Sequence, residues 1–362
     1  RGRGMMRRAG GGWGVGRNWE RACGLLLGVA LDALLGDPRR WHPVAGFGRA
    51  AGTLERRMWA DSRMRGVVFT ALCVGSAVAA SAVASAVAER AAGGRTARNG
   101  TARNGTARGR IARTGMTVIA TWAVLGGRSL TAEGLALHDL LDRGDLAGAR
   151  ERVTHLVGRD PSGLDAAEIA RAGVESVAEN CSDAVVAPLL WGAVAGVPGL
   201  IGYRAVNTLD AMVGHRSPRY ERFGWASARL DDVANYLPAR VCAGLVALVS
   251  GRTQSVWRRT SRYARQHPSP NSGWCEAAYA AALGVRLGGT NVYAGRTEMR
   301  PHLGTGRAPT AADLPRAARL TNSVILAAAS VAAGAALAFG SAAGRLCGAM
   351  CRGGRADRGA LQ

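Results

Sequence analysis

The sequence predicts an all-α protein, a polytopic bundle of membrane-embedded helices with helical loops on the cytoplasmic side. Of its 362 residues, 48% are apolar but only 5% are aromatic, a balance that suits close helix packing. A helix needs about 20 apolar residues to cross a bilayer. Residues 66–88 and 321–344 carry no charge and are long enough to span. Residues 184–203 are also uncharged but contain Pro188 and Pro198.

The charge and cysteine content excludes several classes of protein. The chain has 47 basic and 25 acidic residues, a formal net charge of +22, and it contains no lysine. Arginines that flank apolar helices account for such an excess, and no nucleic-acid-binding motif accompanies them, so no nucleic-acid partner is expected. The seven cysteines form no C-x-x-C pair. A zinc motif and a disulfide framework are therefore not indicated.

We expect one membrane-embedded domain, residues 22–344, with an extension at each end. Residues 1–21 are an Arg- and Gly-rich extension, and residues 345–362 a basic tail expected to be disordered. Within the domain, the repeated pentapeptide TARNG marks residues 95–113 as a low-complexity insertion.

Shorter apolar segments also lie in this domain. Residues 22–36 resemble a signal peptide, but Asp32 interrupts them and no cleavage site follows, so we interpret them as a membrane or interfacial helix. Residues 114–127 and 241–251 are apolar too, yet below the usual spanning length.

A polar stripe precedes the proline-containing run. Residues 162–165 resemble a capping box, and a helix continuing from them would align five polar residues on one face. These are Glu168, Arg171, Glu175, Glu179 and Ser182. A solvated face on which Arg171 pairs with Glu175 is one interpretation. The other is a binding site, because carboxylates at the mouth of a membrane segment are costly unless they bind cations or partners.

Two polar clusters follow the run. Asn207 and Asp210 fall three residues apart on one helical face, and oxygen ligands so arranged suit Mg²⁺. The loop after them is basic and could meet phosphate. Further on, Asp231 and Asn235 share a face, with Asp232 on the adjacent one, and Pro238 is expected to end or kink that helix.

A third cluster spans residues 267–276. Two prolines stiffen the chain, Asn271 or Ser272 could cap an Ala-rich helix that Gly288 and Gly289 would close, and the amides near Gly273 could face an anion. An ordinary helix cap is the alternative.

Six stretches in chain order point to one family. They are LDALLGDPRRWHPV (31–44), VGRD (157–160), ESVAENCSDAVVAPLLW (175–191), YRAVNTLDAMVGHR (203–216), FGWASARLDDVANYLPAR (223–240) and HPSPNSGWCEAAYAAALGVRLGG (267–289). Together they resemble the CobD/CbiB family, the adenosylcobinamide-phosphate synthases of cobalamin biosynthesis. The resemblance covers most of the chain.

The resemblance implies a multi-pass protein of the inner (plasma) membrane. It would join aminopropanol, or its phosphate, to a carboxylate of adenosylcobyric acid at the cost of ATP. An acyl phosphate made with Mg-ATP and attacked by the amine is the simplest route, so positioning and charge neutralisation would be the main catalytic effects. Besides this corrinoid, the amine and membrane lipid, other enzymes of the pathway are candidate partners.

We assign roles to the polar residues on this basis. The expected Mg²⁺ ligands are Glu175, Glu179, Asp210 and Asp232, supported by Asn180, Asp183, Asn207 and Asp231. The expected phosphate-binding residues are Arg204, Arg216, Arg229, Ser269, Asn271 and Gly273. His267 or His42 would accept a proton, although a histidine before proline is more often a polar surface residue.

Because ATP is cytoplasmic, the polar clusters before and after residues 184–203 should face the same side. A simple spanning helix would separate them, so we predict that this run is re-entrant or a buried hairpin. Two rival interpretations stay open: a membrane transporter or sensor that uses the same polar residues as a binding site, and an enzyme that moves phospho-alcohols between lipids. The second would need a longer Asp-rich array.

Overall fold

The computed structural model describes residues 12–37, 42–93, 107–156, 161–215, 217–293 and 296–356. Its helices and strands are α1 (Gly12–Leu35), α2 (Pro43–Met58), α3 (Arg63–Gly93), α4 (Ala107–Val124), α5 (Gly127–Asp142), α6 (Leu146–Val153), α7 (Ala166–Cys181), η2 (Ser182–Val186), α8 (Ala187–Leu209), η3 (Asp210–Gly214), α9 (Trp225–Ala234), α10 (Tyr236–Val249), α11 (Thr253–Tyr263), η4 (Ala264–Gln266), α12 (Ser272–Leu283), β1 (Leu287–Tyr293), β2 (Arg296–Leu303) and α13 (Asp313–Ala356).

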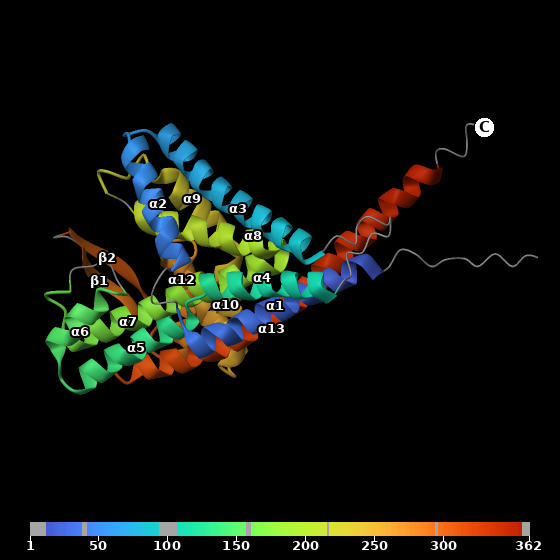
Figure 1. Ribbon diagram of the computed structural model, residues 1–362. Coiled ribbons are helices and arrows are strands. Elements are labelled where there is room, and N and C mark those ends of the chain that lie inside the picture. The colour runs from blue at the N-terminus through green and yellow to red at the C-terminus, as the bar shows by residue number, and fades with distance from the viewer. Residues whose placement is uncertain are drawn as a thin grey trace, which may run out of the picture.

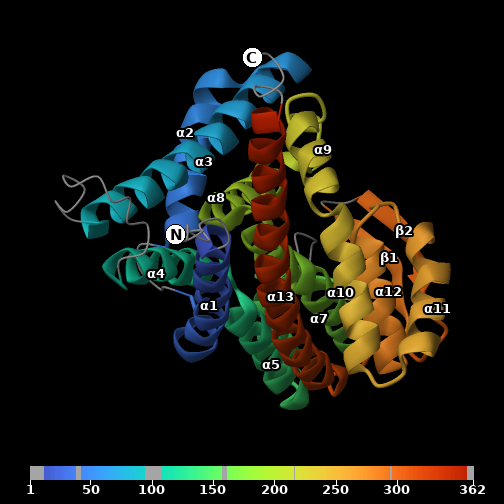
Figure 2. The ribbon, with the colours of Figure 1, turned by 90° about the vertical axis from the view of Figure 1, so that its right-hand side faces the viewer.

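The long helix α13 organises the bundle (Figures 1 and 2). It packs against α1, α5, α7, α8 and α10. Helices α10, α11 and α12 pack on one another as a separate layer, which Figure 2 shows beside α13. Helix α3 packs on α8, and α9 packs on both. The antiparallel strands β1 and β2 contact α7 and α12.

Helices α1 and α4 approach closely because of two glycines one turn apart. A Cβ on Gly24 would lie 2.5 Å from the Cβ of Thr117, and one on Gly28 would lie 2.4 Å from the Cβ of Thr121. Small residues at this spacing let helix backbones pack closely where lipid removes the hydrophobic driving force. Arg113 adds an ion pair from α4 to Glu20 of α1, with Nη2 donating to Oε1 at 2.9 Å.

The expected all-α membrane bundle is confirmed. Among the described residues, three helices are long and apolar enough to cross a membrane: Arg63–Ala92, Ala166–Gly214 and Asp313–Ala338. Helices α9 and α10, bent by 44° at a short break, form a fourth candidate if they count as one span. The bend lies at Asn235, and Pro238 occupies the first turn of α10, where proline costs no hydrogen bond.

The candidate span Ala166–Gly214 does not run straight. Gly196 interrupts α8 with φ 66° and ψ −147°, a conformation that is essentially restricted to glycine. A Cβ on Gly199 would lie 2.2 Å from the carbonyl oxygen of Trp191, although eight residues of a straight helix span about 12 Å. The chain therefore folds back at Gly196. This confirms the predicted hairpin. We call it the α8 hairpin, and its two arms are residues 187–195 and 197–209.

Arg21 of α1 holds the tip of the α8 hairpin. Its Nη1 donates to the carbonyls of Ala193 at 3.0 Å and Val194 at 3.1 Å. Both carbonyls belong to the last turn before the break, where a helix end otherwise leaves them unpaired. A cation at a helix C-terminus also interacts favourably with the helix dipole.

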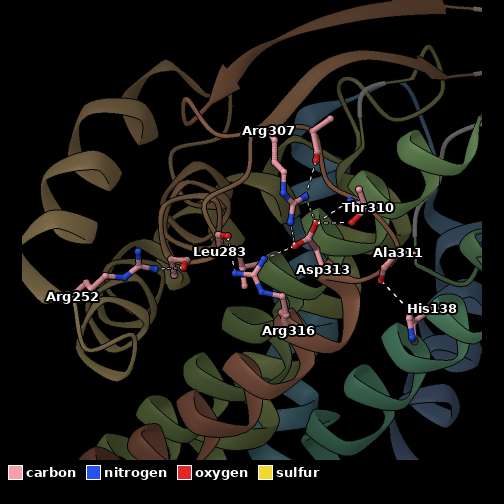
Figure 3. A network of polar contacts seen from close by, with 10 residues as sticks. His138, Arg252, Leu283, Arg307, Thr310, Ala311, Asp313 and Arg316 are labelled. Carbon is pink, nitrogen blue, oxygen red and sulfur yellow. Dashed lines mark hydrogen bonds and ion pairs between the residues drawn. The ribbon is translucent and has the colours of Figure 1, made fainter. Parts of the chain in front are cut away.

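A polar network fixes the end of α12 and the start of α13 (Figure 3). Arg307 and Arg316 both bind the buried carboxylate of Asp313, at 2.7 Å and 2.6 Å. Arg316 also donates to the carbonyl of Leu283, the last residue of α12, at 3.0 Å. The chain leaves α12 at Gly284 with φ 73°, a left-handed end that favours glycine.

Several boundaries expected from the sequence are wrong. Helix α12 ends at Leu283. Gly288 and Gly289 instead belong to β1, which forms with β2 a β-hairpin that was not expected from the sequence. Helix α7 begins at Ala166, and its capping box joins Asp165 to Glu168 rather than starting at Ser162.

The two ends of the chain also differ from the expected division. Helix α1 starts at Gly12, inside the expected extension, and α13 is helical through Ala356, inside the expected tail. Most of the TARNG insertion lies outside the described residues.

Candidate functional site

The α8 hairpin brings the two polar clusters together. Asn207 Nδ2 donates to Asp183 Oδ2 at 3.3 Å, although 24 positions separate these residues. Asp183 lies in η2 and Asp210 begins η3, both of them π-helical turns at the open end of the hairpin. A π turn adds a residue to the turn and redirects its side chains, and such turns are frequent at functional sites. The clusters on either side of the run therefore share one site.

The bend between α9 and α10 supplies a third part of this site. Asn235, at the bend, donates from Nδ2 to Asp231 Oδ2 at 3.0 Å. Its Oδ1 accepts a hydrogen bond of 2.8 Å from the buried hydroxyl of Tyr203 on α8. Asp231 and Asn235 lie on one face, as predicted, because four residues are about one helical turn.

The turn before α12 supplies the fourth part. Ser272 Oγ donates to Glu179 Oε1 at 2.7 Å, and Asn271 Nδ2 donates to the carbonyl of Asp232 at 2.8 Å. Ser269 Oγ accepts from the backbone N–H of Asn271 at 3.3 Å and of Ser272 at 3.2 Å. Arg240 holds the turn from outside by donating to the Pro270 carbonyl at 3.3 Å. The turn is thus fixed against the acidic residues.

The site concentrates negative charge. Glu179, Asp183, Asp210 and Asp231 lie close enough to repel one another, and we call these four residues the acidic cluster. The hydrogen-bond donors that the structure gives them are neutral side chains: Asn207, Asn235 and Ser272. Oδ1 of Asp231 is buried with no partner among the described residues. A cation could therefore bind here without displacing an arginine.

Several other acidic residues in the chain are paired with arginine instead. Glu55 accepts from Arg219 at 2.9 Å, and Glu133 accepts from Arg152 at 2.7 Å. Glu175 pairs with Arg171 at 3.2 Å and accepts from the Gly288 N–H at 2.8 Å. The predicted Arg171–Glu175 pair is confirmed, but the predicted solvated face is wrong, because both side chains are only 11% exposed beneath β1. Because Glu175 is bonded both to Arg171 and to the backbone of β1, its geometry does not support a role as a metal ligand.

Three predicted residues stand at the margin of the site. Asp232 pairs with Arg229 at 3.3 Å, and the Arg229 side chain is 66% exposed. Asn180 donates back to its own helix, to the Ser176 carbonyl at 2.9 Å. These residues adjoin the acidic cluster without joining its network of bonds. Arg216 lies outside the described residues.

The geometry gives His267 and Gly273 packing roles. His267 Nδ1 accepts from the Ser269 N–H at 3.0 Å, and its buried Nε2 lies 3.6 Å from Oε1 of Glu276. With Nδ1 engaged in this way, His267 has no free lone pair with which to accept a proton. Burial, aided by the charge of Arg300, lowers the pKa of His267 below its ordinary value. A Cβ on Gly273 would lie 2.4 Å from that of His267, so this glycine permits close packing.

His42, the other predicted proton acceptor, caps α2. Its Nδ1 accepts from the Val44 N–H at 3.2 Å. Histidine before proline thus serves as a helix cap at this position.

Two acidic residues near the site were not assigned to it from the sequence. Asp37 follows α1, and its carboxylate lies in the electrostatic field of Arg204. Asp32 accepts from the Arg128 N–H at 3.2 Å. Each has an Oδ1 that is buried without a partner among the described residues. An aspartate inside an apolar helix was the available signal for Asp32, since such residues are costly in a membrane.

The side chains available as metal ligands determine how Mg²⁺ could bind at this site. Within the described residues, no three His, Cys, Asp or Glu side chains are arranged to hold a metal ion directly. Mg²⁺ usually keeps several waters and binds through one or two carboxylates together with substrate phosphates. The acidic cluster offers oxygen ligands of this kind, so it suits Mg²⁺ that arrives with a nucleotide. One or two of the residues Asp210, Glu179 and Asp231 would hold it, together with water and phosphate oxygens.

These features define a class: an all-helical membrane protein with an interior acidic site at the open end of a helical hairpin. A family model described as CobD/Cbib protein matches residues 25–321. The chain belongs to this family. No solved structure matches it.

Curated relatives agree with this assignment. Cobalamin biosynthesis protein CobD of Mycobacterium tuberculosis (strain CDC 1551 / Oshkosh) is 48% identical over 316 residues, which cover 86% of this chain and 95% of the relative. The protein of the same name from Geobacter metallireducens is 42% identical and covers 79% and 87%. That from Rhodobacter capsulatus is 40% identical and covers 81% and 90%.

Proposed function

We propose that this protein is an ATP-dependent ligase of cobalamin biosynthesis that joins aminopropanol, or its phosphate, to adenosylcobyric acid. Its family and its relatives, which are named for cobalamin biosynthesis, support a role in that pathway. The amide-forming reaction, with its ATP and Mg²⁺, is the finer part of the proposal. We further propose that the reaction takes place at the plasma membrane.

One observation supports the proposed ATP- and Mg²⁺-dependent amide formation. In a chain with 47 basic residues, the acidic cluster is bonded to neutral donors, so no arginine blocks its carboxylate oxygens from a cation. Making an amide from a carboxylate requires one oxygen to become a leaving group, and phosphorylation by ATP achieves this. Mg²⁺ supplies charge neutralisation for the triphosphate when bound.

The residues of the chain then have distinct tasks. One or two of Glu179, Asp210 and Asp231 would hold the cation, and Asn207 and Asn235 fix the orientation of Asp183 and Asp231 beside it. We assign phosphate binding to Arg229, which is exposed beside Asp232, and to the turn of Ser269, Asn271 and Ser272, which is bonded to Glu179. Holding both reactants in one site converts a bimolecular step into a unimolecular one, which is a large part of such catalysis.

The direct test is reconstitution. Purified protein in detergent is incubated with Mg-ATP, aminopropanol phosphate and adenosylcobyric acid, and the corrinoid product is analysed by mass spectrometry. We expect an amide product that depends on ATP and on Mg²⁺. Formation of product without ATP, or none under any condition with folded protein, contradicts the proposal.

A membrane transporter or sensor is the alternative that one feature favours. A hairpin broken at Gly196, with polar residues at its open end, also suits a solute-binding site. Corrinoid binding without ATP turnover or amide formation would favour this alternative.

A further inference from the structure

A buried tyrosine begins a chain of hydrogen bonds that ends on the acidic cluster. Tyr203 lies on the second arm of the α8 hairpin and is 3% exposed. Its hydroxyl donates to Oδ1 of Asn235 at 2.8 Å, and Nδ2 of Asn235 donates to Oδ2 of Asp231 at 3.0 Å. Both bonds therefore have their donors pointing toward the carboxylate.

This chain fixes which end of the Asn235 amide faces Asp231. A side-chain amide has an accepting end and a donating end. Because the Tyr203 hydroxyl occupies the accepting end, the donating end faces the carboxylate. Successive hydrogen bonds in such a chain polarise one another, which strengthens the bond to the charged group. Asn235 thus holds one oxygen of Asp231, whereas the other, Oδ1, is buried with no partner among the described residues.

Other bonds hold the bend of the main chain at Asn235. The backbone N–H of Asn235 donates to the carbonyl of Asp231 at 2.9 Å. Trp191, on the first arm of the α8 hairpin, donates from Nε1 to the carbonyl of Ala234 at 3.1 Å. The bond from Tyr203 acts instead on the side chain of Asn235, so its loss should leave the bend in place and release the amide.

Contacts that do not depend on charge place Asp231 beside other members of the acidic cluster. A Cβ on Gly214 would overlap Oδ1 of Asp210 and lie 3.4 Å from the Cβ of Ala228, which precedes Asp231 by about one turn. The turn before α12 bonds both to Glu179 and to the backbone carbonyl that follows Asp231 in the chain. The orientation of the Asp231 carboxylate therefore bears on any cation that binds this cluster.

We propose that Tyr203 is a positioning residue for the divalent cation: through Asn235 it holds the Asp231 carboxylate in the orientation that binds Mg²⁺. This inference rests on the proposed function for its choice of cation. Side chains that orient metal ligands without touching the ion commonly change metal affinity by about 10–100-fold when they are removed. Loss of the Tyr203 hydroxyl should therefore weaken cation binding and leave the maximal rate of the reaction nearly unchanged.

Binding of Mn²⁺, which substitutes for Mg²⁺ and is detected by electron paramagnetic resonance, tests this role without turnover. Purified full-length protein in detergent is titrated with MnCl₂. We expect Tyr203→Phe to raise the Kd for Mn²⁺ by about tenfold. Tyr279→Phe is the matched control, because Tyr279 is also buried and its hydroxyl bonds to the hydroxyl of Thr321 on α13 at 2.7 Å. This variant should bind Mn²⁺ as the wild type does.

A double-mutant cycle shows whether Tyr203 acts through Asn235. Asn235→Ala breaks the chain in its middle, so it should weaken Mn²⁺ binding at least as much as Tyr203→Phe does. Adding Tyr203→Phe to Asn235→Ala should then cause no further loss, because the effects of residues in one hydrogen-bond network do not add. Additive losses would show that Tyr203 acts by another route and would overturn the proposal.

Two further results would overturn the role of Tyr203. One is wild-type affinity for Mn²⁺ in Tyr203→Phe, and the other is a wild-type protein that binds no Mn²⁺. If Tyr203→Phe does not fold, Asn235→Ala decides the question, since unaltered Mn²⁺ binding in that variant rules out the chain of bonds.

The ligation assay separates this inference from the proposed function. Tyr203→Phe should raise the Mg²⁺ concentration that gives half the maximal rate by about tenfold, and keep the rate at saturating Mg²⁺ within about twofold of the wild type. If the wild type forms the amide and the Mg²⁺ dependence of Tyr203→Phe is unaltered, the positioning role is wrong and the ligase stands. If Mn²⁺ binding depends on Tyr203 but the wild type forms no amide, the positioning role stands and the ligase is wrong.

Discussion

The partners of individual carboxylates distinguish the site from the rest of the molecule. Asp313 is buried against two arginines, whereas Asp183 and Asp231 each accept from a neutral amide. An arginine partner neutralises a carboxylate, but an amide only orients it. The arginines that pair with carboxylates therefore lie outside the acidic cluster, and its carboxylate oxygens remain available to a cation.

Asp210 is the residue with which to test this cluster. Asp210→Asn keeps the shape of the side chain and removes one charge, so we expect ligation to fall by about 100-fold or more while the protein stays folded. The measurement is the initial rate as a function of Mg²⁺ concentration. Asp61→Asn, at an exposed pair with Arg222, is the control and should keep full activity. An unaltered rate in Asp210→Asn would remove the Mg²⁺ assignment.

His267 gives the fold a defined pH dependence. Because its pKa is lowered in the folded state, the unfolded chain binds the proton more readily. The free energy of unfolding therefore falls as the pH drops below about 6.5, the ordinary pKa of histidine. We expect the Tm of the wild type to fall more between about pH 7.5 and about pH 5.5 than that of His267→Asn, which keeps an acceptor for the Ser269 N–H. Equal changes in the two proteins would show that His267 does not contribute.

Among the elements, the α8 hairpin builds the site. Its reversal at Gly196 and the π turns η2 and η3 place Asp183 and Asp210 at one open end. Each π turn sits where an apolar arm meets the polar region. A straight helix through the same residues would separate these two aspartates by about 40 Å.

Gly196 should tolerate no side chain. Gly196→Ala places a Cβ on a backbone conformation that only glycine adopts easily, so we expect a loss of about 1–3 kcal/mol in stability. Gly115→Ala is the matched control, because a Cβ there would meet none of the described atoms within 4 Å and alanine favours helix. Thermal unfolding of both variants in the same detergent measures the difference. A Gly196→Ala protein as stable as the Gly115→Ala protein would contradict the hairpin.

At the scale of the whole molecule, the bundle must present its site to one aqueous compartment. The loop after η3 and the turn before α12 both adjoin the acidic cluster, so they should lie on the same side of the membrane. We expect Pro218→Cys and Pro270→Cys, each in a background whose own cysteines are replaced by alanine, to react with an impermeant thiol reagent from the same side. Labelling of sealed vesicles of known orientation measures this. Opposite sidedness would rule out a single site.

The sequence by itself determined the helical membrane class and the family, and it named the four residues of the acidic cluster within a larger set of candidates. Uncharged runs of spanning length and spaced carboxylates are local properties of the chain, and they can be read without tertiary contacts. The hairpin was also foreseeable, because a shared aqueous side leaves a proline-broken apolar run few alternatives.

Only the tertiary structure decided which polar residues do what. Glu175 and Glu179 lie one turn apart, yet one bonds β1 and the other the α12 turn, a difference set by segments more than 90 residues away. The pairing of β1 with β2 and the bond from Tyr203 to Asn235 likewise depend on distant segments. Periodicity shows which residues share a face, but the partner of that face comes from packing.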